Sequence, residues 1–335
     1  MTGGLSKVFS HRTGLRRLAG FAALLLCVCP APIRAQEPAA DQAPPIRVNV
    51  DRVNVGVIVT GAHQHLVEGL DRNNFELLDN GVPQPLTAFL TIDEPAQVVL
   101  MVECGPAVYF FRDDLIRAAD RLLTRLAASD SVAIVCYDRT PSLMLDFTTN
   151  KDAARLALRS LNFAAGYADL NLSASLFSVL DSLKRLSGKK TIVLVTSGVD
   201  TSPPADPGAM KRKLDAYDVR ILAVSTAEQL QAKPKHVKTS RQQREDRSEV
   251  KQVLAQAQAS LRDLAETTGG RVYTPKSPKD FDRAYEQIAE LVRHEYVLEF
   301  APPERDGKVH SIEVRVHRPF CLCQASYRQA YLAPR

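Results

Sequence analysis

The chain has 335 residues and a formal net charge of +5 at pH 7, and 45% of its residues are hydrophobic. This length is sufficient for two folded domains. Part of the positive charge lies in the first residues, so the rest of the chain is only mildly basic, which argues against a nucleic-acid partner.

The first 35 residues have the pattern of a secretory signal peptide. A basic segment that ends at Arg17 precedes the apolar run Leu18 to Cys29, which is too short to span a bilayer. Ala35 is the predicted last residue before cleavage, and residues 36–45 form a linker rich in Ala and Pro. We therefore expect an exported protein, periplasmic or secreted, with no membrane span after the signal is removed.

Residues 46–93 predict an N-terminal β unit. Apolar and polar residues alternate in two stretches between Ile46 and Val59, which is the period of a strand. Asn80-Gly81 is the strongest short hairpin signal, and it lies between the strand-like segments 75–78 and 86–90. We expect these two segments to pair with each other.

Residues 96–293 predict an α/β domain in which strands and helices alternate. The expected strands lie near residues 97–103, 131–137, 142–147, 191–196, 219–224 and 271–273. The expected helices lie near residues 112–127, 151–161, 172–186, 207–217, 249–267 and 278–292. Such alternation is typical of a doubly wound, mainly parallel sheet with helices on both faces, as in Rossmann-like folds. The polar segment 229–248 is interpreted as a solvated, partly disordered loop.

Residues 294–334 return to the period of strands, which we expect at 294–300, 309–317 and 323–332. The simplest packing joins these C-terminal strands with residues 46–93 in one β-sandwich-like unit that flanks the α/β domain. Two separate small sheets fit the pattern equally well.

Four cysteines follow the predicted signal peptide: Cys104, Cys136, Cys321 and Cys323. Export would place them in an oxidising compartment, where disulfides are stable. Cys104 and Cys136 both lie at the ends of apolar strands and can form a pair if those strands are neighbours, although buried free thiols are the commoner outcome. The connectivity cannot be deduced from the sequence alone.

Three loops are expected to meet at the carboxyl ends of the parallel strands, where open α/β sheets bind ligands. They are Glu103 to Ala107, Gly166 to Leu170 and Thr196 to Asp200. These loops, with the strands that lead into them, resemble the three metal-site loops of a von Willebrand factor type A (VWA) domain. Flanking segments are similar to the VWFA-related proteins abundant in acidobacteria, namely those at residues 75–89, 264–273, 296–302 and 327–334.

The resemblance implies a divalent ion, usually Mg²⁺, held by carboxylate and hydroxyl oxygens. The five corresponding ligand positions carry Glu103, Gly105, Ala107, Ala168 and Ser197. Four of the five have lost the expected carboxylate or hydroxyl, or carry a shorter side chain. The metal-ion-dependent adhesion site is therefore predicted to be degenerate, with no bound metal and no other cofactor.

Our main hypothesis is an exported, non-enzymatic protein-binding or assembly module that works without a metal and has no catalytic residue. The candidate residues for contact with a protein partner, in the cell envelope or outside the cell, are Glu103, Tyr109, Tyr167, Asp169, Ser197 and Asp200. One alternative is residual adhesion gated by a divalent metal on Glu103, Ser197 and Asp200. An alternative of another class is an exported thiol-dependent hydrolase or redox protein that uses Cys104 or the C-terminal cysteine pair.

Overall fold

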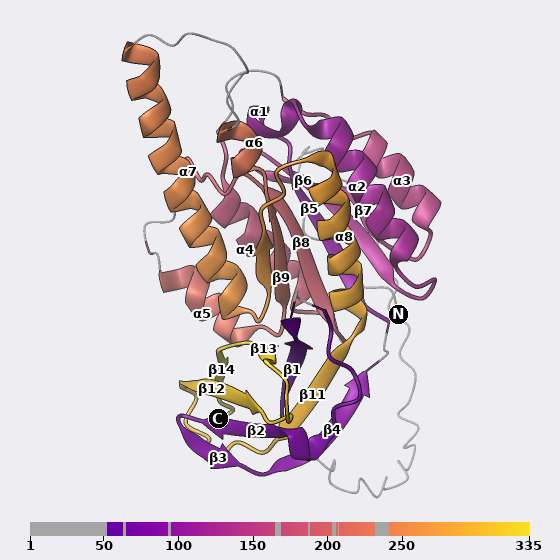
Figure 1. Cartoon of the computed structure of the whole chain (residues 1–335), viewed down its shortest axis with the longest axis vertical. Helices are drawn as coiled ribbons and strands as arrows, with labels where there is room; N and C mark the ends of the chain where they lie inside the picture. The colour runs from indigo at the N-terminus through magenta and orange to yellow at the C-terminus, as the bar shows by residue number, and fades with distance from the viewer. Residues whose placement is uncertain are drawn as a thin grey trace, which may run out of the picture.

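The computed structural model describes residues 52–335 except 63–64, 93–94, 165–168, 187, 203–205, 207 and 232–240. Several sequence-based predictions concern residues outside the described part of the chain. These are the signal peptide, the linker, the segment Ile46 to Val50, Tyr167 and Ala168. The described chain consists of an α/β unit and a smaller β unit, stacked along the long axis of the molecule (Figure 1). No helix in this part of the chain is both long enough and apolar enough to cross a membrane.

A six-stranded sheet forms the centre of the α/β unit, in the order β10-β9-β8-β5-β6-β7. Its strands are β5 (Gln97–Glu103), β6 (Ser131–Tyr137), β7 (Pro141–Thr148), β8 (Lys190–Thr196), β9 (Arg220–Ser225) and β10 (Arg271–Tyr273). All neighbouring strands are parallel except β6 and β7. The strand order reverses between β5 and β8, so the predicted doubly wound, mainly parallel sheet is confirmed.

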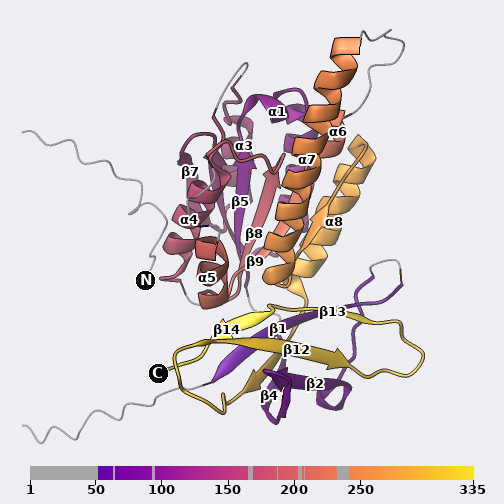
Figure 2. The ribbon, with the colours of Figure 1, turned by 90° about the vertical axis from the view of Figure 1, so that its left-hand side faces the viewer.

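Helices cover both faces of this sheet (Figure 2). One face is covered by α1 (Pro106–Tyr109), α2 (Arg112–Arg125), α3 (Lys151–Arg159) and α8 (Pro278–Arg293). The other face is covered by α4 (Leu172–Leu183), α5 (Gly208–Ala216) and α7 (Arg241–Thr267), and the short helix α6 (Ala227–Gln231) follows β9. Val98 and Leu100 of β5 point into one core, whereas Val99 points into the other. Burial on both sides explains why this strand is an uninterrupted apolar run.

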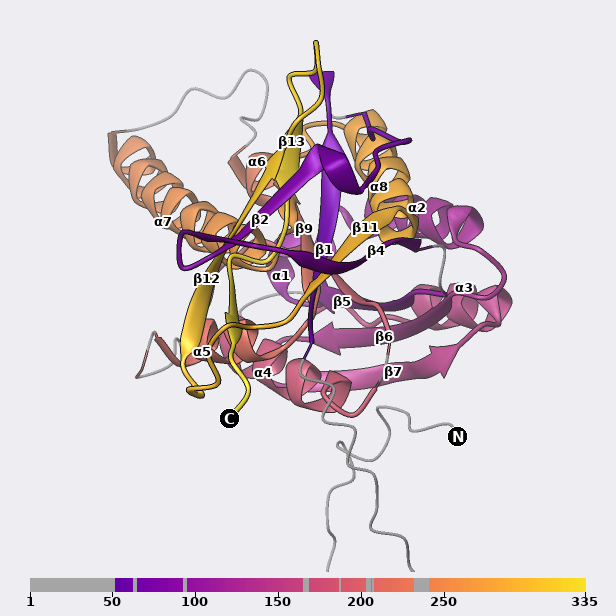
Figure 3. The same ribbon diagram turned by 90° about the horizontal axis from the view of Figure 1, so that it is seen from below.

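The β unit consists of two four-stranded sheets, β13-β1-β11-β4 and β14-β12-β2-β3. Its elements are β1 (Val53–Thr60), a 3-10 turn (Arg72–Asn74), β2 (Phe75–Asp79), β3 (Val82–Gln84), β4 (Leu86–Ile92), β11 (Glu295–Phe300), β12 (Val309–Val316), β13 (Gln324–Ser326) and β14 (Ala330–Leu332). Strands from before and after the α/β unit pair within each sheet (Figure 3). Both sheets share one apolar core, which includes Val55, Phe75, Leu298 and Tyr331. The predicted sandwich-like unit of N- and C-terminal strands is therefore confirmed.

The hairpin at Asn80-Gly81 pairs different segments from those expected. It joins β2 to β3, and both turn residues have positive φ, 48° at Asn80 and 80° at Gly81, as a type I′ turn requires. β4 instead crosses to the other sheet and pairs with β11. Pro85 lies between β3 and β4 and has no amide hydrogen to donate, which explains why the pairing of β2 with β3 ends there.

Two further boundaries differ from the expectation. α7 begins at Arg241, inside the polar segment 229–248 for which the sequence predicts a loop. The predicted strand 323–332 is instead two short strands, β13 and β14, in different sheets. Between them, Arg328 forms a β-bridge with Thr268, and the Gln329 amide donates to the Thr267 carbonyl at 3.1 Å. This contact with the α/β unit separates the two strands.

Candidate functional site

The loops that follow β5, β6 and β8 meet at the carboxyl edge of the sheet, opposite the sandwich (Figure 1). The Cys104 amide donates to the Tyr137 carbonyl at 2.8 Å, and the Ala164 amide donates to the Cys104 carbonyl at 2.8 Å. The Thr201 amide donates to the Leu170 carbonyl, also at 2.8 Å. We refer to the described residues 104–110, 138–139, 169–171 and 198–200 as the crown.

A disulfide joins two of the crown's supporting strands. Cys104 and Cys136 are bonded, with 5.8 Å between their Cα atoms. Parallel pairing places Val102 of β5 opposite Cys136 of β6, and this register brings Cys104 within reach. The expectation that free thiols are the commoner outcome is therefore wrong for this pair. Cys321 and Cys323 are also bonded to each other, so all four described cysteines are oxidised.

Glu103 ends β5 beneath the crown, and it is 0% exposed. Its Oε2 atom accepts hydrogen bonds from the Ser197 amide at 2.7 Å, the Ser197 hydroxyl at 2.8 Å and the Thr196 hydroxyl at 2.9 Å. Burial raises the pKa of Glu103 above its ordinary value, and the hydrogen bonds from Ser197 and Thr196 only partly oppose that shift. The carboxyl group is therefore biased toward its protonated form.

Ser197, like Glu103, is completely buried. Neither side chain can touch a partner at the surface, so the direct contact role predicted for both residues does not fit the structure. The physical reason is that each polar group finds its hydrogen-bond partner in the other when both turn inward. The network continues through Thr196, whose hydroxyl lies 2.7 Å from the Tyr137 hydroxyl and accepts from the Gly198 amide at 2.8 Å. These residues support the crown from below.

The residues of the crown do not fit the Mg²⁺ ion that the VWA resemblance implies. Gly105 and Ala107 offer no side-chain oxygen, and a Cβ at Gly105 would lie 2.6 Å from the Leu170 Cδ2 atom. An apolar side chain therefore occupies the space that a longer residue at this position would need. The Oε2 atom of Glu103 bonds to the Ser197 hydroxyl, and Oε1 is the single side-chain oxygen of this pair that has no hydrogen-bond partner. Mg²⁺ demands near-octahedral oxygen ligands, and this donor set is too small to supply them.

The other two candidate carboxylates hold loops in place. The Oδ2 atom of Asp200 accepts from the Ser173 amide in the first turn of α4 at 2.9 Å, and Oδ1 accepts from the Ser202 amide at 3.0 Å. The Oδ2 atom of Asp169 lies 2.7 Å from an Arg139 guanidinium nitrogen. Asp200 thus anchors a helix, whereas the Arg139–Asp169 ion pair forms part of the accessible surface of the crown.

Phe110, which the sequence-based prediction missed, is 82% exposed. It follows α1, and its ring lies 5.6 Å from the ring of half-buried Tyr109 in an edge-to-face arrangement. The Arg112 guanidinium lies 4.6 Å from the centroid of the Tyr109 ring. The run Tyr109-Phe110-Phe111, just before a polar helix start, was the signal in the sequence that could have identified this patch.

A cavity of about 510 Å³ opens beside the crown, among α4, α5 and α7. The crown residues Gly198, Val199 and Asp200 line one part of it. The other walls carry mainly apolar side chains, including Leu172, Leu176, Leu214, Val253, Leu261 and Leu264. The cavity is therefore an apolar groove that is continuous with the crown.

The α/β unit is a doubly wound, mainly parallel sheet with helices on both faces, and the described parts of the loops lie at its switch point. In this unit, whose loop sequences resemble those of a VWA domain, the crown and the residues beneath it lie where the resemblance expects the metal-site loops, but their polar groups bond to one another and to backbone amides.

No family model and no curated protein matches the chain. Among solved structures, a von Willebrand factor type A protein from Catenulispora acidiphila is 12% identical, with 79% of this chain and 74% of that chain covered and a TM-score of 0.44. The conserved hypothetical protein BatB from Bacteroides thetaiotaomicron is 12% identical, with coverage of 58% and 98% and a TM-score of 0.41. The vWF domain of the type V pili tip protein Mfa5 from Porphyromonas gingivalis is 11% identical, with coverage of 60% and 96% and a TM-score of 0.41.

Proposed function

We propose that this chain is an exported, non-enzymatic module that binds a protein partner, in the cell envelope or outside the cell, through the crown and without a metal ion. The observation that carries the proposal is the exposure of Phe110 beside Tyr109 and Arg112 at the switch point of the α/β unit. Aromatic and arginine side chains supply much of the binding energy at protein interfaces. Doubly wound sheets bind their ligands at this edge, so the position of the patch supports the same conclusion.

The surroundings of Phe110 have the composition of an interface. The ion pair between Arg139 and Asp169 provides a polar border, as interfaces have around their apolar centre. The groove of about 510 Å³ beside Asp200 provides apolar space in which a side chain of the partner can be buried.

The proposed independence from a metal ion rests on the hydrogen bonds that Glu103, Ser197 and Asp200 already make. The alternative of gating by a residual metal needs oxygens of Glu103, Ser197 and Asp200 to face one ion. Instead, Glu103 accepts hydrogen bonds from Ser197, and Asp200 accepts them from backbone amides. A cation that used all three residues would have to replace the hydrogen bonds of Ser197 and Asp200, and burial, which raises the pKa of Glu103, disfavours the charged carboxylate that such an ion needs.

The disulfides support export and argue against the thiol-dependent alternative. Both described cysteine pairs are oxidised, as is typical of proteins in the periplasm or outside the cell. Cys104 therefore offers no thiolate, the form of cysteine that acts as a nucleophile.

A photo-crosslinking amino acid at position 110, introduced in the producing cells, tests the proposed interface. We expect one discrete protein adduct that persists in the presence of EDTA. The matched control is position 156, because Leu156 is 68% exposed but lies on α3, outside the crown. We expect no adduct there. In the purified protein, Phe110→Ala should change the free energy of unfolding by less than about 0.5 kcal/mol, because the side chain is exposed. Loss of partner co-purification in this variant would therefore reflect the lost contact and not unfolding.

Two results would contradict this proposal. Equal adducts from positions 110 and 156, or none from position 110, would show that the crown is not the interface. An adduct that disappears with EDTA and returns with Mg²⁺ would show that the interaction depends on a metal.

A further inference from the structure

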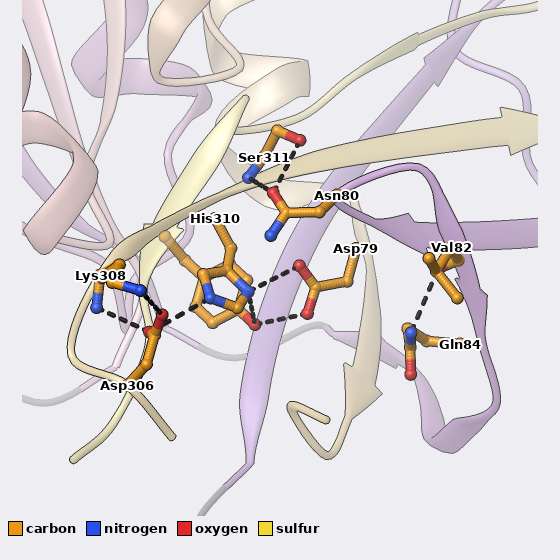
Figure 4. Close-up of polar contacts among 9 residues, drawn as sticks. Asp79, Asn80, Val82, Gln84, Asp306, Lys308, His310 and Ser311 are labelled. Carbon is orange, nitrogen blue, oxygen red and sulfur yellow. Dashed lines mark hydrogen bonds and ion pairs between the residues drawn. The ribbon is translucent and has the colours of Figure 1, made fainter. Parts of the chain in front are cut away.

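A buried histidine of the sandwich lies between two carboxylates (Figure 4). His310 is on β12 and is only 3% exposed. Its Nδ1 atom lies 2.9 Å from the Oδ1 atom of Asp79 on β2, and its Nε2 atom lies 3.3 Å from the Oδ1 atom of Asp306. Because Asp79 and His310 are 231 positions apart in the sequence, only the folded chain brings them together.

Asp79 fixes the orientation of the imidazole ring. Asp79 is buried, and its Oδ2 atom accepts a hydrogen bond from the Tyr331 hydroxyl at 2.8 Å. Its Oδ1 atom is then the acceptor for the Nδ1–H group of His310, which leaves the Nε2 lone pair directed toward Asp306. Histidines that bind metals in proteins almost always donate their other ring N–H to a carboxylate, a carbonyl or water in this way.

The carboxylates on the open side of His310 come from the turn before β12. One potential ligand atom each from Glu304, Asp306 and His310 lies within 4.8 Å of the other two. Two ligands of a tetrahedral Zn²⁺ ion, each about 2.0–2.2 Å from the metal, are about 3.3–3.5 Å apart. The distance of 3.3 Å between His310 Nε2 and Asp306 Oδ1 matches that separation and is long for a hydrogen bond.

We propose that Glu304, Asp306 and His310 form a Zn²⁺ site, with water as the fourth ligand and Asp79 as the residue that positions His310. Imidazole nitrogen together with carboxylate oxygen suits zinc, whereas Mg²⁺ and Ca²⁺ prefer oxygen ligands alone. Glu304 and Asp306 are exposed, so a small movement of the turn brings them to bonding distance. The site is distinct from the degenerate metal site of the α/β unit and does not rest on the proposed function.

Lys308 competes with the ion for Asp306. Its Nζ atom lies 3.1 Å from the Oδ2 atom of Asp306, and its backbone amide donates to Oδ1 at 2.8 Å. A Zn²⁺ ion on Oδ1 would therefore lie close to the ammonium charge on Oδ2 of the same carboxylate, which weakens its binding. Lys308→Met removes this competitor and keeps a similar chain length, so it should strengthen Zn²⁺ binding.

Equilibrium dialysis and isothermal titration of the untagged exported chain with ZnCl₂ test the site. We expect one Zn²⁺ per chain, no comparable binding of Mg²⁺ or Ca²⁺, and a tetrahedral Co²⁺ absorption spectrum. The double variant Glu304→Gln/Asp306→Asn should lose both the binding and the spectrum, and because both residues are exposed its far-UV circular dichroism should not change. His317→Ala is the matched control, because this exposed histidine lies 3.6 Å from Glu76 at the other end of the same strand region.

The positioning of His310 by Asp79 is tested with Asp79→Asn, which should weaken Zn²⁺ binding about 10–100-fold. Tyr331→Phe removes the other hydrogen bond of Asp79 but keeps the carboxylate, so it should weaken binding less. The proposal is overturned by an untagged chain that binds no Zn²⁺ at roughly millimolar concentration. It is also overturned by binding that survives in the double variant or that disappears in His317→Ala.

Discussion

Two buried glutamates lie at opposite ends of the α/β unit, Glu103 on β5 and Glu295 on the sandwich strand β11, and their surroundings differ in charge. Glu103, at the crown end, is bonded to two hydroxyls and one amide. Glu295, at the sandwich end, lies 2.5 Å from an Arg220 guanidinium nitrogen and 3.0 Å from the Lys189 Nζ atom. Burial raises the pKa of Glu103. Burial acts on Glu295 as well, but the positive charges of Arg220 and Lys189 outweigh it, so the pKa of Glu295 is lowered.

The comparison shows that the two ends of the sheet are held by different kinds of interaction. The crown end combines hydrogen bonds from hydroxyl and amide donors with the disulfide between Cys104 and Cys136. The sandwich end relies on buried charges that join the two units, because Arg220 also donates to the Gly56 carbonyl of β1 at 3.1 Å. A Cβ at Gly56 would lie 1.8 Å from the Oε1 atom of Glu295, so this position needs glycine. We therefore expect the two ends to respond differently to substitution and to pH.

The largest effect is expected from Glu295→Gln. The substitution leaves Arg220 and Lys189 buried without a counter-charge, which should cost about 3–5 kcal/mol of unfolding free energy in urea titrations. Glu299→Gln is the matched control on the same strand, because Glu299 pairs with the largely exposed Arg52. It should cost less than about 1 kcal/mol. Equal losses in the two variants would contradict the special role of the buried charges.

The next largest effect is expected from removing the crown disulfide. The bond joins cysteines that are 32 positions apart, and closing a loop of this length in the unfolded chain stabilises the fold by roughly 3–4 kcal/mol. Cys104→Ser/Cys136→Ser should therefore lower the free energy of unfolding by about that amount. Cys321→Ser/Cys323→Ser is the control, because that bond spans only two positions and constrains the unfolded chain less. If the Cys104→Ser/Cys136→Ser variant is as stable as the control variant, the explanation by loop closure is wrong.

The smallest effect on stability is expected from Glu103→Gln, within about 1 kcal/mol near neutral pH, because glutamine keeps a side-chain oxygen that can accept the hydrogen bonds from Ser197 and Thr196. Its pH dependence is more informative. The folded pKa of Glu103 is raised above 4.5, so its contribution is fully present below that value and is lost as pH rises. Wild type should therefore lose stability relative to Glu103→Gln as pH increases from about 4.5.

Glu295 should show the opposite dependence. Its folded pKa is lowered below 4.5, so its contribution is present above that value and is lost as pH falls through the folded pKa. Wild type should lose stability relative to Glu295→Gln as the solution becomes more acidic than about pH 4.5. Urea titrations of wild type, Glu103→Gln and Glu295→Gln from pH 3 to 8 measure how each stability difference changes with pH. Changes of the same sign would contradict the expected difference between the two glutamates.

Local patterns in the sequence were sufficient for the fold class and for the place of the candidate site. Continuous apolar strands alternating with amphipathic helices predict a doubly wound sheet, because residues close in the chain determine each element. The rule that ligands bind at the carboxyl ends of the strands then identifies the loops at Glu103, Leu170 and Ser197.

The roles of the residues at the site were decided only by tertiary structure. Glu103 is a buried support because Ser197, 94 positions away, meets it across the sheet, and Leu170 fills the space above Gly105. Phe110 became the exposed contact candidate because no other element covers that turn in the described chain.

Tertiary structure also decided how the cysteines pair, which strands the hairpin joins and what the histidine of the sandwich contacts. The sequence supplied the cysteines and the Asn80-Gly81 turn, but strand register decided that Cys104 reaches Cys136 and that β3, not β4, pairs with β2. Periodicity reports which side of an element is buried. Periodicity does not report which side chain from a distant part of the sequence packs against that buried side. Hydrogen bonds, ion pairs and metal sites depend on the identity of this distant side chain.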